Sequence, residues 1–265
     1  MTRPILHFSH ANSYPAGTYR AFFHGLAPHY DVRALPLHAH NPRYPVRDGW
    51  EELGQELVDE LRQRYREPVI LVGHSFGGML AMMAAHRHPE LARCVVLLDS
   101  PVLAGWRACF LRVAKLVGAD MKFSPARVSM RRREHWTGRE AAYQHYETKD
   151  LFASWPAEVL QDYVDYGTEP ADAGVRLRFS RDIETAIYRT LPHHLGRLAR
   201  RRFPVPIGFI GGDQSIECRH AGLTATRRLV GPHFRQIPGG HLFPMENPEQ
   251  AALALHRLIQ SLLPR

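Results

Sequence analysis

Cysteine is scarce in this sequence, and its three residues lie far apart. Cys94, Cys109 and Cys218 form no CxxC pair, and their number is odd. The spacing therefore predicts neither a disulfide framework nor a zinc site. A free thiol such as Cys94, which opens an apolar run, usually lies in the core. A chain with only free thiols is typical of a reducing compartment.

Long hydrophobic runs are also missing. No apolar stretch approaches the roughly 20 residues that a membrane-spanning helix needs. The N-terminus leads almost directly into the strand expected at Pro4–Phe8, without the charged and apolar regions of a signal peptide. We therefore expect a soluble, cytoplasmic protein with no membrane span.

Lysine is nearly absent, since only three of the 34 basic residues are Lys, and the net charge is +8. Arginines gather at Arg131–Arg133, Arg200–Arg202 and Arg227–Arg228. Such charge favours an anionic partner, for example nucleic acid, anionic lipid or a coenzyme A ester. No nucleic-acid-binding motif accompanies it, so no nucleic-acid partner is predicted. A solvated, arginine-rich surface is the simpler interpretation.

The sequence does contain short apolar runs that alternate with longer segments of helical periodicity. This alternation is typical of a parallel sheet with crossover helices, and continuous apolar runs predict strands covered on both faces. Strands are expected at Pro4–Phe8, Asp31–Leu37, Pro68–Val72, Cys94–Leu98, Val205–Ile210 and His233–Ile237. Helices are expected at Thr18–Leu26, from Asp48 through Leu61, from Met79 to before Pro89, at Glu217–Leu229 and at Pro248–Leu263.

The block 101–202 interrupts this alternation with several helical pieces and one strand-like segment, Val175–Phe179. We expect an α/β core of residues 1–100 and 203–265. A mainly helical cap, 101–202, would be inserted over the strand ends, where open α/β sheets bind ligands. The aromatic residues of the cap would line an apolar substrate site or, more simply, form the cap's own core. They include Trp106, Phe110, Trp136, Tyr143, Tyr146, Trp155, Tyr163 and Tyr166.

The pentapeptide Gly-His-Ser-Phe-Gly at 73–77 matches the pattern G-x-S-x-G between an expected strand and an expected helix. In that context the pattern predicts a nucleophile elbow, a sharp turn that exposes its serine at the sheet edge. The glycines leave room for the turn, and the N-terminus of the helix favours developing negative charge. Ser75 is therefore the expected nucleophile.

Three motifs in this order resemble those of a known family. They are His10-Ala11-Asn12 after the first strand, Gly-His-Ser-Phe-Gly-Gly at 73–78 and Gly239-Gly240-His241 near the end. The chain resembles the α/β-hydrolase fold superfamily, in its cap-bearing serine esterase, lipase and epoxide-hydrolase-like branch. The resemblance covers essentially the whole chain outside the cap. It implies a mostly parallel sheet flanked by helices, a catalytic triad and an oxyanion hole.

A serine hydroxyl needs a neighbouring base, and the resemblance implies His241, in the loop before the last helix. The acid must orient the imidazole and stabilise its charged form. Asp213, which follows the strand Val205–Ile210, gives the order Ser, Asp, His of this fold class and is the expected acid. Asp99, at the end of Cys94–Leu98, is the alternative, because some family members take their acid from that strand.

Acyl transfer places negative charge on the carbonyl oxygen, which a hydrolase meets with preorganised N–H donors. One donor is expected to be the backbone N–H of Phe76, and the other that of Asn12 in the loop after the first strand. Relatives usually have glycine where this chain has Ala11, so the backbone there must adopt an angle that alanine tolerates. The resemblance gives His10 a role in bracing this loop, and His74 is expected to pack at the elbow.

These residues predict a hydrolase that cleaves a small-molecule carboxylic ester through an acyl-enzyme on Ser75. Alternatives are a thioesterase or acyltransferase, cleavage of a lactone or a C–C bond, perhydrolysis, and a non-catalytic ligand receptor. Serine at this position argues against epoxide hydrolases and haloalkane dehalogenases, which use a carboxylate nucleophile. No metal or organic cofactor is required, and pairs such as His38/His40 lack further ligands at metal spacing. The oligomeric state is left open.

Overall fold

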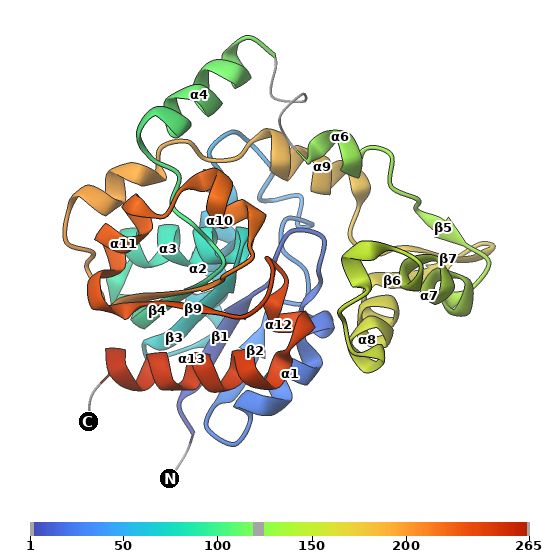
Figure 1. Ribbon diagram of the computed structural model, residues 1–265, viewed down its shortest axis with the longest axis horizontal. Coiled ribbons are helices and arrows are strands. Elements are labelled where there is room, and N and C mark those ends of the chain that lie inside the picture. The colour runs from blue at the N-terminus through green and yellow to red at the C-terminus, as the bar shows by residue number, and fades with distance from the viewer. Residues whose placement is uncertain (1–2, 119–124, 264–265) are drawn as a thin grey trace.

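The core of the protein is a sheet of six parallel strands in the computed structural model, which describes residues 3–118 and 125–263. The strand order is β2-β1-β3-β4-β8-β9 (Figure 1). The strands are β1 (Ile5–Ser9), β2 (Asp31–Ala34), β3 (Val69–His74), β4 (Ala92–Leu98), β8 (Ile207–Gly212) and β9 (Phe234–Ile237). The six expected strands are confirmed, with ends that differ by a few residues.

Helices connect these strands and follow the last one. They are α1 (Arg20–Leu26), α2 (Glu51–Arg64), α3 (Phe76–Arg87), α10 (Ile216–Ala221), α11 (Thr224–Val230), α12 (Phe243–Glu246) and α13 (Pro248–Leu262). One long helix was expected over Glu217–Leu229, but Gly222, with φ of 73°, separates α10 from α11. Among the described residues, no helix has both the length and the apolar character needed to cross a bilayer.

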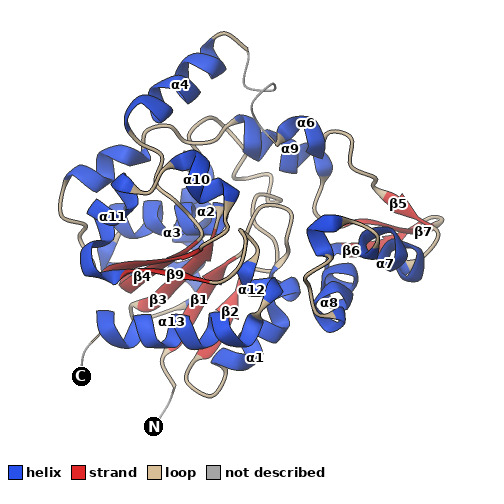
Figure 2. Cartoon of the chain, in the orientation of Figure 1, coloured by secondary structure: helices blue, strands red, loops and turns tan. Residues whose placement is uncertain are grey.

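Helices cover both faces of the sheet, because successive side chains of a strand point to opposite sides. In β3, Ile70 and Val72 belong to one apolar cluster, which includes residues of α1 and α13. Val69 and Leu71 belong to the other cluster, with residues of α2 and α3. Figure 2 shows the sheet between these two helical layers. Burial on both faces explains why the strands are continuous apolar runs.

The 101–202 segment contains helices and a second, smaller sheet (Figure 2). The expectation of a single strand there is wrong, since three short antiparallel strands pair in the order β5-β7-β6. The elements are α4 (Gly105–Leu116), α6 (Ala126–Ser129), β5 (His135–Trp136), α7 (Arg139–Glu147), α8 (Ala157–Gly167), β6 (Thr168–Ala171), β7 (Gly174–Leu177) and α9 (Arg181–Arg189). Trp136, Tyr146, Trp155 and Tyr163 are buried in contact with one another, whereas Trp106 is exposed.

Candidate active site

Ser75 lies at the tip of a tight turn between β3 and α3. Its backbone angles, φ 52° and ψ −116°, are in a sparsely populated region, which costs a residue other than glycine roughly 1–3 kcal/mol. A Cβ atom on Gly73 would collide with the backbone of Gly77, and one on Gly77 would collide with the carbonyl of Ser9. The chain therefore makes the sharp strand–turn–helix connection expected from the motif, with the hydroxyl of Ser75 at the start of α3.

His241 connects Ser75 to a carboxylate. The Ser75 hydroxyl donates to Nε2 of His241 at 3.0 Å, and Nδ1 donates to Oδ1 of Asp99 at 2.7 Å. The proton is assigned to Nδ1 because an ionised carboxylate can only accept, which leaves the Nε2 lone pair facing the hydroxyl. Both distances are within the range for proton transfer by a general base. The structure thus brings together Ser75, His241 and the alternative acid, Asp99.

Asp99 is held rigidly at the end of β4. It is fully buried, with φ of 41°, and its backbone N–H still pairs with the carbonyl of Ile210 in β8. One carboxylate oxygen accepts from the N–H of Gly212 at 2.8 Å, and the other accepts from the hydroxyl of Ser215 at 2.6 Å and from His241. Burial raises the pKa of Asp99, but these hydrogen bonds and the charge of His241 outweigh it, so the pKa lies below its ordinary value. Asp99 is therefore a fixed negative charge beside the imidazole.

Asp213 does not contact His241, so the expectation that it orients the imidazole is wrong in this structure. It is exposed, and its Oδ1 accepts from the N–H of Gly239 at 3.2 Å. Its own N–H donates to the carbonyl of Ile237 in β9 at 2.9 Å, which continues the strand pairing. The physical reason is local pairing: the N–H and carboxylate of Asp213 are engaged with Ile237 and Gly239, whereas its neighbours Gly212 and Ser215 hold the carboxylate of Asp99.

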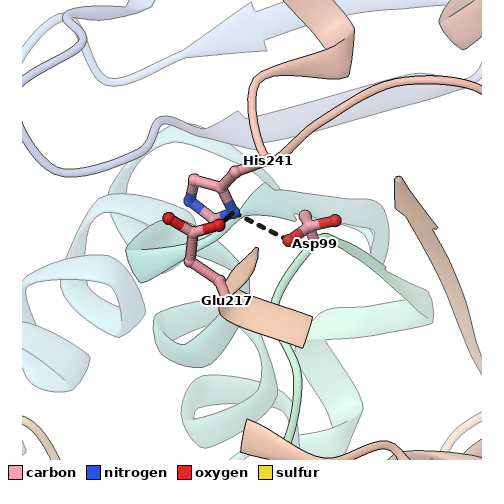
Figure 3. Close-up of side chains that lie close together, drawn as sticks. All are labelled: Asp99, Glu217 and His241. Atoms are coloured by element: carbon pink, nitrogen blue, oxygen red, sulfur yellow. Dashed lines mark hydrogen bonds and ion pairs between the residues drawn. The ribbon is translucent and has the colours of Figure 1, made fainter. Parts of the chain in front are cut away.

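A second carboxylate lies near the imidazole, as Figure 3 shows. Oε2 of Glu217, at the start of α10, is 3.7 Å from Nδ1 of His241, and its side chain is half-exposed. Burial lowers the pKa of His241, but the hydrogen bond and charge of Asp99, with the charges of Glu217 and Glu246, outweigh it. The pKa of His241 therefore lies above its ordinary value, which suits a base that must hold a proton between two steps.

The ligand atoms of Asp99, Glu217 and His241 lie within 4.8 Å of one another, so these side chains could also hold a cation. Both oxygens of Asp99, however, already accept hydrogen bonds, and Nδ1 of His241 carries the proton of one of them. A cation at Nδ1 would displace that proton and break the contact that orients the ring. The hydrogen bonds alone account for the positions of Asp99 and His241.

The two residues expected to supply oxyanion donors have free backbone N–H groups in the part of the chain that the structure describes. Phe76 is the first residue of α3, where N–H groups have no intrahelical partner. Asn12 lies in the loop after β1, which approaches the elbow closely where Gly77 meets Ser9. The side chain of Asn12 is engaged elsewhere, since its Nδ2 donates to the carbonyl of Glu184 at 3.2 Å. Its backbone N–H is thus the group available to a substrate.

The loop after β1 tolerates alanine because its left-handed residue is Ser13, with φ of 74°, and not Ala11. His10 braces this loop, as the family resemblance implied. Its Nδ1–H donates to the carbonyl of Ala11 at 2.8 Å, and its Nε2 accepts from the N–H of His38 at 2.9 Å. Burial holds the pKa of His10 well below its usual range, so the ring stays neutral and can both donate and accept.

His74 links the loop after β1 to the loop that carries His241, a role that the sequence did not predict. The N–H of Ala11 donates to the hydroxyl of Tyr19 at 3.1 Å, and that hydroxyl donates to Nδ1 of His74 at 2.7 Å. The Nε2–H of His74 then donates to the carbonyl of His241 at 2.9 Å. Burial lowers the pKa of His74 to about 3, which preserves this neutral tautomer. No signal in the sequence pairs Tyr19 with His74.

Arg132 is largely withdrawn from solvent, with 18% of its side chain exposed, although a solvated face was expected for Arg131–Arg133. Its guanidinium donates to Glu184 at 2.8 Å and to the hydroxyl of Tyr146 at 3.3 Å, and it also contacts Ser13 and Tyr163. A buried charge is tolerated only when it is paired in this way. Because Ser13 follows Asn12, this cluster ties the 101–202 segment to the loop that carries an expected oxyanion donor.

A model of the alpha/beta hydrolase family matches residues 8–254, nearly the whole chain. The chain belongs to this family. The expected fold class, a mostly parallel sheet flanked by helices, is thereby confirmed together with the family. The match spans both parts of the proposed core and the segment between them.

Two curated proteins and one solved structure illustrate the similarity to known proteins. The chain is 22% identical over 228 residues to 2-(acetamidomethylene)succinate hydrolase of Mesorhizobium japonicum, which covers 85% of this chain and 76% of that protein. It is 26% identical over 137 residues to a type I acyl-CoA thioesterase of Penicillium roqueforti, which covers 50% of this chain but only 26% of that protein. A crystal structure of E-2-(acetamidomethylene)succinate hydrolase superposes with a TM-score of 0.78 at 21% identity, over 98% of this chain and 92% of that one. At this identity the superposition shows a shared fold and nothing about a shared activity.

Proposed function

We propose that the protein is a serine hydrolase that cleaves a carboxylic ester, with Ser75 as nucleophile, His241 as base and Asp99 as acid. The observation that carries the proposal is the continuous hydrogen-bond chain from the Ser75 hydroxyl through the imidazole to the buried Asp99, with distances of 3.0 and 2.7 Å. Asp99 replaces Asp213, the acid expected from the sequence. The membership of a hydrolase family supports the general class of reaction.

In this mechanism Nε2 of His241 removes the proton of Ser75 as its oxygen attacks the ester carbonyl. The negative oxygen of the tetrahedral intermediate is stabilised by the N–H groups of Phe76 and Asn12. The protonated imidazole, stabilised by Asp99, gives its proton to the departing alcohol, and the acyl group remains on Ser75. Water, deprotonated by His241, then attacks the acyl-enzyme and releases the acid.

The 101–202 segment would act as the cap of this site. Its residue Glu184 accepts from the side chain of Asn12, and Arg132 contacts Ser13 beside it. These contacts are made to the loop that supplies a donor to the intermediate. A shift of the segment would therefore alter the geometry of the oxyanion hole, which makes the segment part of substrate selection as well as a cover.

Thioester hydrolysis is a second candidate, because one pocket could hold an anionic group of the substrate. A pocket of about 250 Å³ is lined by Arg107, Arg200 and Arg228 together with small residues. Among the described residues, none of these three guanidinium groups has a carboxylate within 4.0 Å. Guanidinium groups that have no carboxylate partner suit a phosphate, such as those of coenzyme A, although that of Arg107 also lies over the ring of Trp106, 4.6 Å from its centroid. The fungal relative, an acyl-CoA thioesterase, supports the same class of substrate.

The nucleophile is tested with a fluorophosphonate probe, which labels activated serines. The native protein is expected to be labelled and Ser75→Ala is not. Labelling of Ser75→Ala to the native extent would show that another residue is the nucleophile. Labelling of the native protein without turnover of any p-nitrophenyl ester, acyl-CoA or lactone would instead favour the ligand-receptor alternative.

The two substrate classes are separated by comparing p-nitrophenyl esters with acyl-CoA. For a thioesterase, Arg228→Ala is expected to raise KM for acyl-CoA and to leave the p-nitrophenyl ester unaffected, because only acyl-CoA carries phosphates. Arg219→Ala, an exposed arginine outside the pocket, is the matched control. Equal effects of both variants would mean that the general positive charge of the surface, and not this pocket, attracts acyl-CoA. Ester hydrolysis would then be the one proposed activity.

A further inference from the structure

Helix α4 presents its apolar side to solvent. Trp106, Val113 and Val117 are spaced along one face of a helix, and Leu116 lies beside them. Trp106 is 70% exposed, Leu116 76% and Val117 69%. Ordinary surface helices have the reverse arrangement, with the apolar stripe facing the core. In Figure 1, α4 projects from the upper edge of the molecule.

The inner side of α4 carries two of its three cations. Lys115 binds the carboxylate of Asp48 and donates to the carbonyl of Leu191 at 3.0 Å. Arg107 lies over Gly222, the residue that follows α10. The helix is thus anchored to the body by polar contacts, and its outward orientation follows from them. Because these contacts fix which side faces out, the exposed apolar stripe is a property of the folded protein.

Helix α6 repeats the pattern with cations among the apolar residues. Val128 is 75% exposed, and Arg127 beside it and Arg131, which follows the helix, are exposed as well. In α4, Arg112 is exposed next to the apolar stripe. Among the described residues between Asp99 and Glu134, the exposed charged residues are Arg112, Arg127, Arg131 and Arg133, all of them basic. An apolar stripe bordered by arginine is the composition of helices that lie in the surface of an anionic bilayer.

We propose that this surface, α4 with α6, docks the protein onto membranes that contain anionic lipid. The apolar side chains of α4 would enter the boundary between headgroups and acyl chains, and Arg112, Arg127 and Arg131 would contact lipid phosphates. A second copy of the chain fits this surface less well. A symmetric contact would bring the arginines of two copies together, and α4 and α6 contain no acidic residue to compensate. The proposal does not depend on the identity of the substrate or of the catalytic residues.

Binding to membranes can be measured through the fluorescence of Trp106. Of the four tryptophans, Trp50, Trp136 and Trp155 are buried, so a solvent-dependent change in emission reports on Trp106. The full-length protein is mixed with phosphatidylcholine vesicles, with or without phosphatidylglycerol. We expect a blue shift of the emission and co-sedimentation with the anionic vesicles, both weakened by salt because exposed charges are screened. Ser75→Ala is expected to bind equally well, which separates docking from catalysis.

Two variants and one control test the surface itself. Leu116→Ser with Val117→Ser is expected to lower partitioning roughly tenfold or more, and Arg112→Gln about fivefold. Leu253→Ser is the matched control, because Leu253 is also exposed, at 48%, but lies on α13. Native secondary structure and native labelling of Ser75 by the fluorophosphonate probe would establish that the variants fold.

Three outcomes would overturn the proposal. The first is the absence of binding to either vesicle, and the second is binding that the α4 variants leave unchanged. The third is a dimer in light scattering that Leu116→Ser with Val117→Ser dissociates, which would assign the surface to a second copy of the chain.

Discussion

The ends of β4 and β8 are alike in sequence and different in the structure. Each strand is a buried apolar run followed by an aspartate within a few residues, Asp99 or Asp213. Asp99 is fully buried and accepts from Gly212, Ser215 and His241. Asp213 is exposed and accepts from one backbone N–H. Two neighbouring strands thus deliver the same residue type to one sheet edge, and only one of them reaches the imidazole.

The difference shows that β8 supports the acid without supplying it. The N–H of Gly212 and the hydroxyl of Ser215, both at the end of β8, hold the carboxylate that comes from β4. Asp213 instead receives the N–H of Gly239, in the loop that leads to His241. A carboxylate that stabilises an imidazolium must itself be fixed and shielded from water. Asp99 meets that condition and Asp213 does not.

The largest effect is expected when the carboxylate on β4 is neutralised. In Asp99→Asn the imidazole of His241 loses the negative charge that orients it. The amide can also donate to Nδ1, which favours the wrong tautomer of the ring. We expect kcat to fall by roughly 10³–10⁴-fold with KM little changed. Steady-state kinetics on the best p-nitrophenyl ester measures this. Retention of more than a tenth of native kcat would remove Asp99 from the triad.

A smaller loss is expected when the support from β8 is removed. Ser215 donates to Asp99 at 2.6 Å and also accepts from the N–H of Cys218 as the N-cap of α10. Ser215→Ala is expected to lower kcat about tenfold, because a hydrogen bond to a charged group contributes about 1.5–3 kcal/mol. The loss of the cap should lower the free energy of unfolding by about 1 kcal/mol.

Ser215→Thr keeps the hydroxyl and serves as the control for this prediction. It is expected to recover most of the activity and stability, measured by kinetics and by urea denaturation. Equal losses in the Ala and Thr variants would mean that packing, and not the hydrogen bond to Asp99, explains the effect.

The comparison also indicates what a sequence can predict about such a site. Ser75 and His241 could be predicted because each lies within a local motif, and the strands because burial on both faces produces continuous apolar runs. The choice between Asp99 and Asp213 could not be made in this way, because both follow apolar strands. It depends on which of the two carboxylates the N–H of Gly212 and the hydroxyl of Ser215 enclose.

The 101–202 segment was the least predictable part for a related reason. Its strands are short, β5 having only His135 and Trp136, so they show no measurable alternation. Arg132 could not be distinguished from Arg131 and Arg133, because its burial depends on Glu184 and on tyrosines distant in sequence. Such contacts are determined by tertiary structure, and no local pattern encodes them.

Removing the charge of Glu217 should shift the pH dependence of activity and leave the maximal rate nearly unchanged. This carboxylate helps to raise the pKa of His241, so Glu217→Gln should lower that pKa. His241 acts as a base only when it is neutral, and activity is therefore lost as the pH falls through its pKa. The acid limb of kcat/KM in the variant is expected at lower pH than in the native protein. Glu249→Gln, on α13 and not among the groups that shift His241, should leave the limb in place.

The smallest effect is expected at the end of β8. In Asp213→Asn the amide oxygen can still accept from the N–H of Gly239, and the residue is exposed, so only its charge is lost. Surface substitutions of this kind usually change stability by less than about 0.5 kcal/mol, and we expect kcat and kcat/KM within about threefold of native. In the double variant with Asp99→Asn, the effects should simply add, because two residues that share no partner act independently. If Asp213→Asn lowered kcat as much as Asp99→Asn does, the conclusion would change. Asp213 would then reach the imidazole during turnover, through a movement of the loop at Gly239.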